Sequence, residues 1–141
     1  MKLALLALLA TAAFAQNSLY LTTADSTVMP GSQIVVDVMY SGAEIAGVQF
    51  LSSILGSKMK VAAGSAAAAE AKKVYCNPAL FCMVIGYNAT QMNSGQVAAF
   101  TFNAPSKKGT YQYVIGPALG VSPTGAAIAV TPGAALTITV E

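Results

Sequence analysis

Apolar and polar residues alternate with a period of two along most of this chain. The pattern is clearest over residues 33–40, where large apolar side chains occupy every second position: Ile34, Val36, Val38 and Tyr40. In a β-strand, successive side chains point to opposite faces of the sheet, so this alternation is typical of a strand with one face in a core. The pattern therefore predicts a protein built from β-strands.

Nine segments carry this strand pattern, and short turn sequences separate them. The predicted strands cover residues 17–23, 33–40, 45–54, 58–62, 81–87, 97–103, 110–115, 126–131 and 134–140. Pro-Gly pairs at Pro30-Gly31 and Pro132-Gly133 favour tight turns, because proline presets φ and glycine tolerates a positive φ. We expect Gly116-Pro117 to end the strand 110–115 and a short edge strand to follow at 119–122. The alanine-rich residues 63–73 are expected to form a loop with some helical character.

The number of short strands and the near absence of helical periodicity predict the fold class. We expect an all-β protein, an antiparallel jelly-roll β-sandwich of about nine strands. No linker divides the sequence, so residues 16–141 form one predicted domain. The terminal strands 17–23 and 134–140 are the candidates for exposed edges, where a neighbouring chain can add a strand.

The first fifteen residues have the organisation of a secretory signal peptide. Lys2 precedes an apolar run over residues 3–10, and Ala13-Phe14-Ala15 provides the small residues that a signal peptidase recognises. The apolar run is too short for a membrane span, which needs about 20 residues. We therefore expect cleavage after residue 15, secretion of residues 16–141, and no membrane span in the mature chain.

Export determines how the two cysteines are interpreted. Cys76 and Cys82 are the two cysteines of the chain. An even number of cysteines in a secreted protein favours a disulfide. Their C-x5-C spacing differs from the C-x-x-C spacing of redox-active pairs. We therefore predict a structural disulfide between Cys76 and Cys82.

Charged residues make up only 9% of the chain, hydrophobic residues make up 55%, and histidine is absent. The sparse charge gives no basic surface for nucleic acid, and the lack of histidine excludes Ser-His-Asp and Cys-His catalysis. The five acidic residues are scattered, which argues against a two-carboxylate hydrolase. Zinc would need the two cysteines that we assign to a disulfide. Calcium is the one metal alternative, with Asp25 and Asp37 near one edge as its candidate ligands. We predict that the chain is not an enzyme.

Two sets of residues are candidates for contact with carbohydrate. Tyr111 and Tyr113 stand two residues apart on one strand, so both rings share a face and could stack on a sugar together with Tyr87. The alternative is that these rings line the core, as aromatic strand residues usually do. Asn88 opens an Asn-Ala-Thr sequon in a predicted loop, which makes it a candidate glycosylation site.

Three sequence patches resemble a known family. They are Pro30-Gly31-Ser32 leading into residues 35–38, the strand 45–50 with its Gly-Val-Gln-Phe sequence, and residues 94–102 followed by Gly109-Thr110-Tyr111 and the strand 133–140. Together they resemble a cohesin-type domain, in the superfamily that also contains several carbohydrate-binding modules. The resemblance implies a non-catalytic jelly roll that acts in extracellular assembly, in docking to a partner module, or in polysaccharide attachment.

These observations predict a secreted, non-catalytic, cohesin-like module. Our leading hypothesis is a structural subunit that associates with copies of itself, or with another extracellular protein module, through strand edges and forms a filament or matrix. The sparse surface charge favours such contacts between copies. The alternative is a carbohydrate-binding or dockerin-type docking module. No cofactor, nucleic-acid partner or catalytic residue is predicted.

Overall fold

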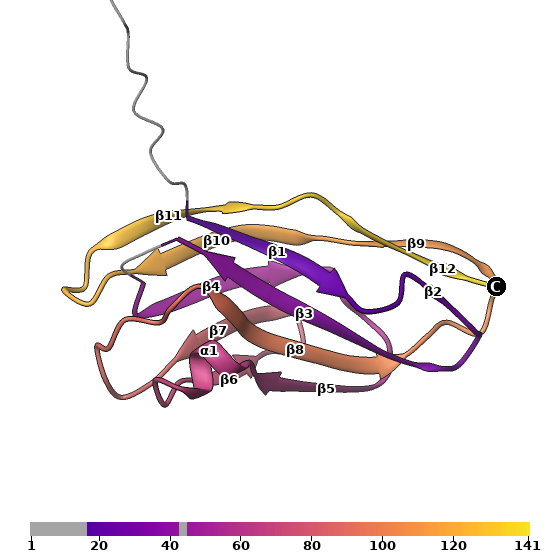
Figure 1. Cartoon of the computed structure of the whole chain (residues 1–141), viewed down its shortest axis with the longest axis horizontal. Helices are drawn as coiled ribbons and strands as arrows, with labels where there is room; N and C mark the ends of the chain where they lie inside the picture. The colour runs from indigo at the N-terminus through magenta and orange to yellow at the C-terminus, as the bar shows by residue number, and fades with distance from the viewer. Residues whose placement is uncertain (1–16, 43–44) are drawn as a thin grey trace, which may run out of the picture.

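The computed structural model describes residues 17–42 and 45–141, which form twelve strands and one short helix. Figure 1 shows the elongated β-structure. The elements are β1 (Ser18–Thr23), β2 (Thr27–Val28), β3 (Gln33–Ser41), β4 (Gly47–Ser52), β5 (Ser57–Ala63), α1 (Ser65–Ala68), β6 (Lys73–Cys76), β7 (Phe81–Ile85), β8 (Gly95–Asn103), β9 (Gly109–Tyr113), β10 (Ile115–Val121), β11 (Ala127–Pro132) and β12 (Leu136–Val140). The predicted signal peptide, residues 1–15, lies outside the described residues. Within the described part of the chain, no helix has the length and apolar character that a membrane crossing requires.

The strands form a nine-stranded sheet and a three-stranded sheet. The large sheet has the order β5-β8-β3-β1-β11-β10-β4-β7-β6, and the small sheet has the order β2-β12-β9. The large sheet turns back on itself at the parallel pairing of β1 with β11, where Ser18 lies opposite Thr131. Its two halves then face each other across the core. The prediction of an all-β sandwich is confirmed.

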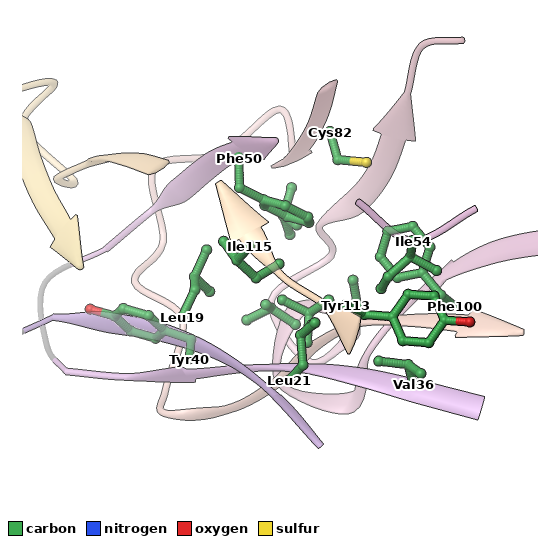
Figure 2. Close-up of a cluster of buried hydrophobic side chains, with 14 of the residues drawn as sticks. Leu19, Leu21, Val36, Tyr40, Phe50, Ile54, Cys82, Phe100, Tyr113 and Ile115 are labelled. Atoms are coloured by element: carbon green, nitrogen blue, oxygen red, sulfur yellow. The ribbon is translucent and has the colours of Figure 1, made fainter. Parts of the chain in front are cut away.

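The core fills the space between the two halves of the large sheet. Figure 2 shows side chains from both halves meeting there, among them Leu19, Val36 and Phe100 from one half and Phe50 and Ile115 from the other. All five are at least 95% buried. The predicted alternation is observed in β3, because Ile34, Val36, Val38 and Tyr40 are buried while the residues between them are exposed or half-buried.

The region after residue 110 differs from the prediction. Gly116-Pro117 does not end a strand, because β10 runs through it from Ile115 to Val121. The pairing of β10 with β4 shifts register between Ile115 and Ala118, and such a bulge accommodates a proline that has no N–H to donate. Residues 119–122 are also not at an edge, since β10 lies between β11 and β4. The predicted strand 110–115 is divided between β9 and β10, which contributes to the strand count of twelve instead of nine.

The prediction that the terminal strands form the exposed edges is wrong. β1 lies between β3 and β11, and β12 lies between β2 and β9, so both have partners on each side. The edges of the large sheet are β5 and β6, and those of the small sheet are β2 and β9. β1 and β11 are more than 100 residues apart in the sequence, and their pairing places β1 inside the large sheet. A strand at the end of the chain is therefore not a strand at the edge of the sheet.

Two tyrosines in the core make the free energy of unfolding depend on pH in the alkaline range. Tyr40 is 1% exposed and Tyr113 is 5% exposed, and the Tyr113 ring packs edge-on against Phe102 with 5.6 Å between ring centroids. Burial raises the pKa of both phenols above 10.0, the ordinary value, and the neighbouring Tyr111 adds to the effect on the pKa of Tyr113. The folded protein therefore keeps these protons at a pH where the unfolded chain has lost them.

We expect the free energy of unfolding to fall as the pH rises above about 10, because there the unfolded chain binds fewer protons than the folded chain. Urea unfolding at a series of alkaline pH values measures this. Tyr113→Phe keeps the ring and removes the phenol, so the fall should become less steep. Tyr20→Phe, on the exposed side of β1, is the matched control. An unchanged slope in Tyr113→Phe would contradict the prediction.

Candidate functional site

One face of the large sheet exposes apolar side chains. We call it the outer apolar face, and it consists of Leu51 on β4, Tyr75 on β6, Met83 and Ile85 on β7, and Leu119 and Val121 on β10. Leu51, Tyr75, Ile85, Leu119 and Val121 are 37–49% exposed. The solvent-facing side of an antiparallel sheet usually carries polar residues, so this face departs from the common pattern.

The register of four neighbouring strands brings these residues together. Leu119 lies opposite Gln49, Gln49 lies opposite Met83, and Met83 lies opposite Tyr75, so one row crosses the four strands β10, β4, β7 and β6. The alternate residues of the same strands, such as Phe50 and Val84, point into the core. These strands therefore have apolar residues on both faces.

A shallow groove crosses the outer apolar face at Gly47. A Cβ atom at this position would lie 3.2 Å from Cγ1 of Val121 and 3.3 Å from Cγ2 of Ile85, so the absence of a side chain lets these two residues approach the β4 backbone closely. The groove has a volume of about 110 Å³ and extends past Gln49, Met83 and Leu119.

A second hollow lies beside the edge strand β6. Tyr75, Met83, Ile85 and Tyr87 line it, with a volume of about 450 Å³. Tyr87 follows the end of β7 and is fully exposed. This hollow continues the outer apolar face toward the sheet edge, where Lys73 lies opposite Ile85 and supplies a positive charge.

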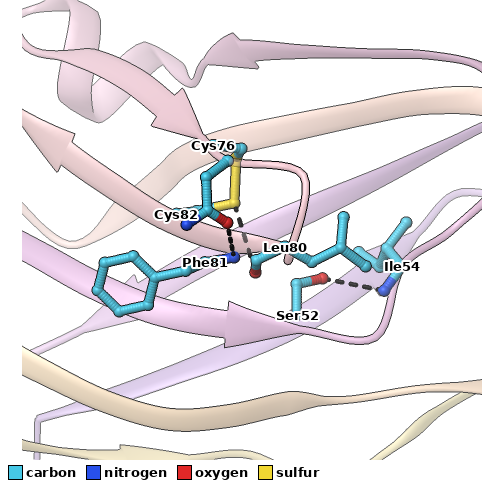
Figure 3. The surroundings of a disulfide bond; sticks show 7 residues. Ser52, Ile54, Cys76, Leu80, Phe81 and Cys82 are labelled. Carbon is cyan, nitrogen blue, oxygen red and sulfur yellow. Dashed lines mark hydrogen bonds between the residues drawn. A yellow bond between two sulfur atoms is a disulfide. The ribbon is translucent and has the colours of Figure 1, made fainter.

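The predicted disulfide is present and ties β6 to β7. Cys76 and Cys82 lie directly opposite each other in the two strands, with 4.1 Å between their Cα atoms. Figure 3 shows the bond beside the turn that joins the strands, where Asn77 Oδ1 accepts a hydrogen bond from the Phe81 N–H at 3.1 Å. The disulfide therefore closes the hairpin that carries half of the outer apolar face.

Removing this disulfide by replacing both cysteines with alanine should lower the free energy of unfolding by about 2 kcal/mol, because the loop that it closes is short. Urea unfolding of the variant and of the wild type, each with and without reductant, measures the loss. Reductant should destabilise the wild type by a similar amount and leave the variant unchanged. Equal unfolding midpoints for oxidised and reduced wild type would contradict the prediction.

At the other end of the same hairpin, a buried lysine holds the loop that follows β7. Lys72 is 2% exposed, and its ammonium donates to the backbone carbonyl oxygen of Asn88 at 2.9 Å and to Oδ1 of Asn88 at 2.6 Å. Burial lowers the pKa of Lys72, and the Glu70 carboxylate partly opposes this shift. The two hydrogen bonds compensate for the cost of burying the amine.

The structure separates Tyr87, Tyr111 and Tyr113, the three candidates for sugar stacking. Tyr113 is buried in the core, and Tyr111 is half-buried and donates its hydroxyl to the Lys107 carbonyl oxygen at 2.7 Å. Both lie on β9 in the small sheet, whereas Tyr87 follows β7 in the large sheet. Tyr113 cannot offer its ring to a sugar, so the core interpretation holds for this residue. Tyr87 instead shares a hollow with Tyr75.

The candidate polar residues have structural partners. Asn88 is exposed, and besides accepting from Lys72 it donates its amide to the Glu70 carbonyl oxygen at 3.0 Å. Asp37 accepts a hydrogen bond from Gln96 at 2.6 Å, and Asp25 lies in the loop between β1 and β2. Among the described residues, no three histidine, cysteine, aspartate or glutamate side chains come together as a metal site would require.

Sequence reasoning missed the outer apolar face. The signal was present, because the segment 81–87 is apolar at nearly every position instead of every second one. Such a segment is usually a strand buried on both sides. Only the order of the strands shows that β10, β4, β7 and β6 have one side covered by the core and the other open to solvent.

Comparisons with known proteins identify the fold. No family model matches the chain, and no curated protein matches its sequence. Among solved structures it is similar to a cohesin module from a family 33 glycoside hydrolase of Clostridium perfringens, with a TM-score of 0.72, 8% identity, and coverage of 91% of this chain and 98% of that one.

Two further cohesins match at similar length. The sixth cohesin of Acetivibrio cellulolyticus scaffoldin B has a TM-score of 0.65 and 20% identity, with 89% of this chain and 99% of that chain covered. A non-cellulosomal cohesin from the hyperthermophilic archaeon Archaeoglobus fulgidus has a TM-score of 0.67 and 13% identity, with 90% and 92% covered. At these identities the likeness concerns the architecture alone. The TM-scores and the coverage of both chains show that this chain has the cohesin fold.

Proposed function

We propose that this chain is a secreted, non-catalytic docking module that binds another protein module through the outer apolar face. That face is the observation that carries the proposal. Five of its side chains are 37–49% exposed on adjacent strands. So many neighbouring apolar side chains are usually buried in a core or in an interface. A contiguous exposed apolar patch marks an interaction surface in soluble proteins.

The similar structures suggest which kind of partner this face accepts. Cohesins of Acetivibrio cellulolyticus and Clostridium thermocellum were solved in complex with dockerins. A dockerin-type module is therefore the partner that we propose. Export is supported by the Cys76–Cys82 disulfide, because disulfides persist in oxidising compartments. The absence of histidine from the sequence supports a role without catalysis.

A binding assay with purified dockerin modules tests this function. The chain, with its disulfide intact, would be titrated by calorimetry against a panel of dockerins of the types seen in the similar complexes. We expect at least one of them to form a one-to-one complex, and hydrogen exchange to slow in β4, β7 and β10 when it binds. Failure to bind any dockerin of the panel would overturn the dockerin assignment.

Self-association is a second candidate function, and the edge strand β6 favours it. β6 borders the outer apolar face and has no strand partner beyond it in the large sheet. A second copy could pair with this edge and cover the apolar residues at the same time. Sedimentation velocity over a range of concentrations, with negative-stain electron microscopy, tests this. Filaments would support a structural subunit, and a monomer at every concentration would exclude it.

Polysaccharide attachment is a third candidate, and the hollow between Tyr75 and Tyr87 favours it. Exposed aromatic rings can stack on sugars, and these two rings line one open space. A pull-down on insoluble polysaccharide, with wild type and with Tyr75→Ala plus Tyr87→Ala, tests the idea. Retention that is equal for both proteins would exclude this hollow as a sugar site.

A further inference from the structure

Lys72 is in an environment that is rare for a lysine. Among the described residues it is the one charged side chain that is buried, and its amine lies against a single asparagine. Its aliphatic chain packs over Gly86, where an added Cβ would lie 3.1 Å from Cδ of Lys72. Lys72 precedes β6, and Asn88 follows β7 closely, so the pair joins the two open ends of one hairpin.

Hydrogen bonds hold every polar atom of the Asn88 side chain. Oδ1 accepts from Nζ of Lys72 at 2.6 Å and from the backbone N–H of Thr90 at 3.1 Å, while Nδ2 donates to the Glu70 carbonyl oxygen at 3.0 Å. A C=O bond is about 1.2 Å long, so Nζ lies within about 4 Å of the amide carbon Cγ. That is close to the distance of about 3–3.5 Å from which a nucleophile attacks.

We propose that Lys72 and Asn88 join in an intramolecular amide cross-link, with release of ammonia. The amine of Lys72 attacks Cγ of Asn88, and the Nζ–Cγ bond forms. One proton passes from Nζ to the departing amide nitrogen, the Cγ–Nδ2 bond breaks, and ammonia leaves. One amide replaces another, so the reaction requires no oxidant, reductant or external reagent.

The surroundings provide what this reaction needs. A lysine attacks only as the neutral amine, and burial lowers the pKa of Lys72, which increases the neutral fraction. Negative charge develops on Oδ1 during the attack, and the Thr90 N–H already points at this atom. Because Asn88 is exposed, ammonia can leave to solvent.

The cross-link would lock the β6–β7 hairpin at both ends. The disulfide between Cys76 and Cys82 lies at its closed end, and the Lys72–Asn88 bond would lie at its open end. β6 is an edge strand with a partner on one side only, so it is the strand of the outer apolar face most easily detached. The bond would also fix the loop that carries Tyr87.

Mass spectrometry of the purified protein tests this proposal without any binding partner. We expect the intact mass to be lower than that of the disulfide-bonded chain by one molecule of ammonia, in addition to the ammonia that an N-terminal Gln16 loses when it cyclises in wild type and variants alike. After digestion with trypsin, the chain should not be cut after Lys72, and a branched peptide should link Lys72 to Asn88. Because the readout is a mass, its result is independent of whether the chain binds a dockerin.

Two variants and their matched controls complete the test. Lys72→Arg keeps a positive charge but stays protonated, and Asn88→Ser removes the amide carbon, so neither should form the branched peptide or lose the ammonia that residue 88 releases. Lys73→Arg and Asn93→Ser change exposed neighbours of the same types and should still lose it. A wild-type mass equal to that of the uncross-linked, disulfide-bonded chain would overturn the proposal. A glycan attached to Asn88 would also overturn it, because the glycan would occupy the same amide nitrogen.

Discussion

Replacing Phe100 with alanine should lower the free energy of unfolding by about 3–5 kcal/mol, the range measured for deleting a buried aromatic ring. Phe100 is completely buried and lies on β8 between Val36 of β3 and Val61 of β5. The ring reaches the space between the two halves of the large sheet, where it meets the opposite half of the core. Its removal would therefore weaken the packing that holds the sandwich together.

Urea unfolding measures this loss. A domain of this size usually has a free energy of unfolding of about 5–15 kcal/mol, so Phe100→Ala would remove a large part of it. Thr101→Ala, the next residue on the same strand, points to the other side of the sheet and should cost about 1 kcal/mol or less. If the two variants unfolded at the same urea concentration, the assignment of Phe100 to the centre of the core would be wrong.

The strands themselves could be predicted from the sequence because their signal is local. In β3 the apolar residues occupy every second position, and the predicted segment 33–40 differs from the observed Gln33–Ser41 by one residue. The Cys76–Cys82 disulfide was predictable for a similar reason, since two cysteines allow one pairing. The local pattern was less reliable at Gly116-Pro117, which was expected to end a strand. There β10 continues, because a bulge lets it pair with β4 on both sides of the proline.

The candidate site could not be predicted in the same way because it depends on contacts between distant segments. Leu119 and Met83 are on one face only because both β10 and β7 pair with β4. The same holds for Lys72, which belongs to the alanine-rich segment predicted as a loop and is buried because the chain returns to it at Asn88. Tyr113 shows the reverse case, where an aromatic candidate for binding belongs to the core.

Placing lysines at Leu119 and Ile85 should abolish or strongly weaken partner binding through the outer apolar face. Both residues are well exposed, at 44% and 38%, so the fold should tolerate the longer charged side chains. In a complex, however, each ammonium would be buried against an apolar partner surface without a counter-charge. We expect the affinity to fall by at least about thirtyfold, because a central interface residue contributes about 2 kcal/mol or more and each 1.4 kcal/mol is a factor of ten.

Calorimetric titration with the dockerin that binds the wild type most tightly measures this effect. Val35→Lys is the matched control, because Val35 is also 44% exposed but lies on β3, in the other half of the sandwich. Val35→Lys should bind like the wild type, and all the proteins should unfold at similar urea concentrations. If Leu119→Lys with Ile85→Lys bound normally, a dockerin would have to use another surface. If instead the double variant lost filaments while Val35→Lys kept them, the same face would serve contacts between copies of the chain.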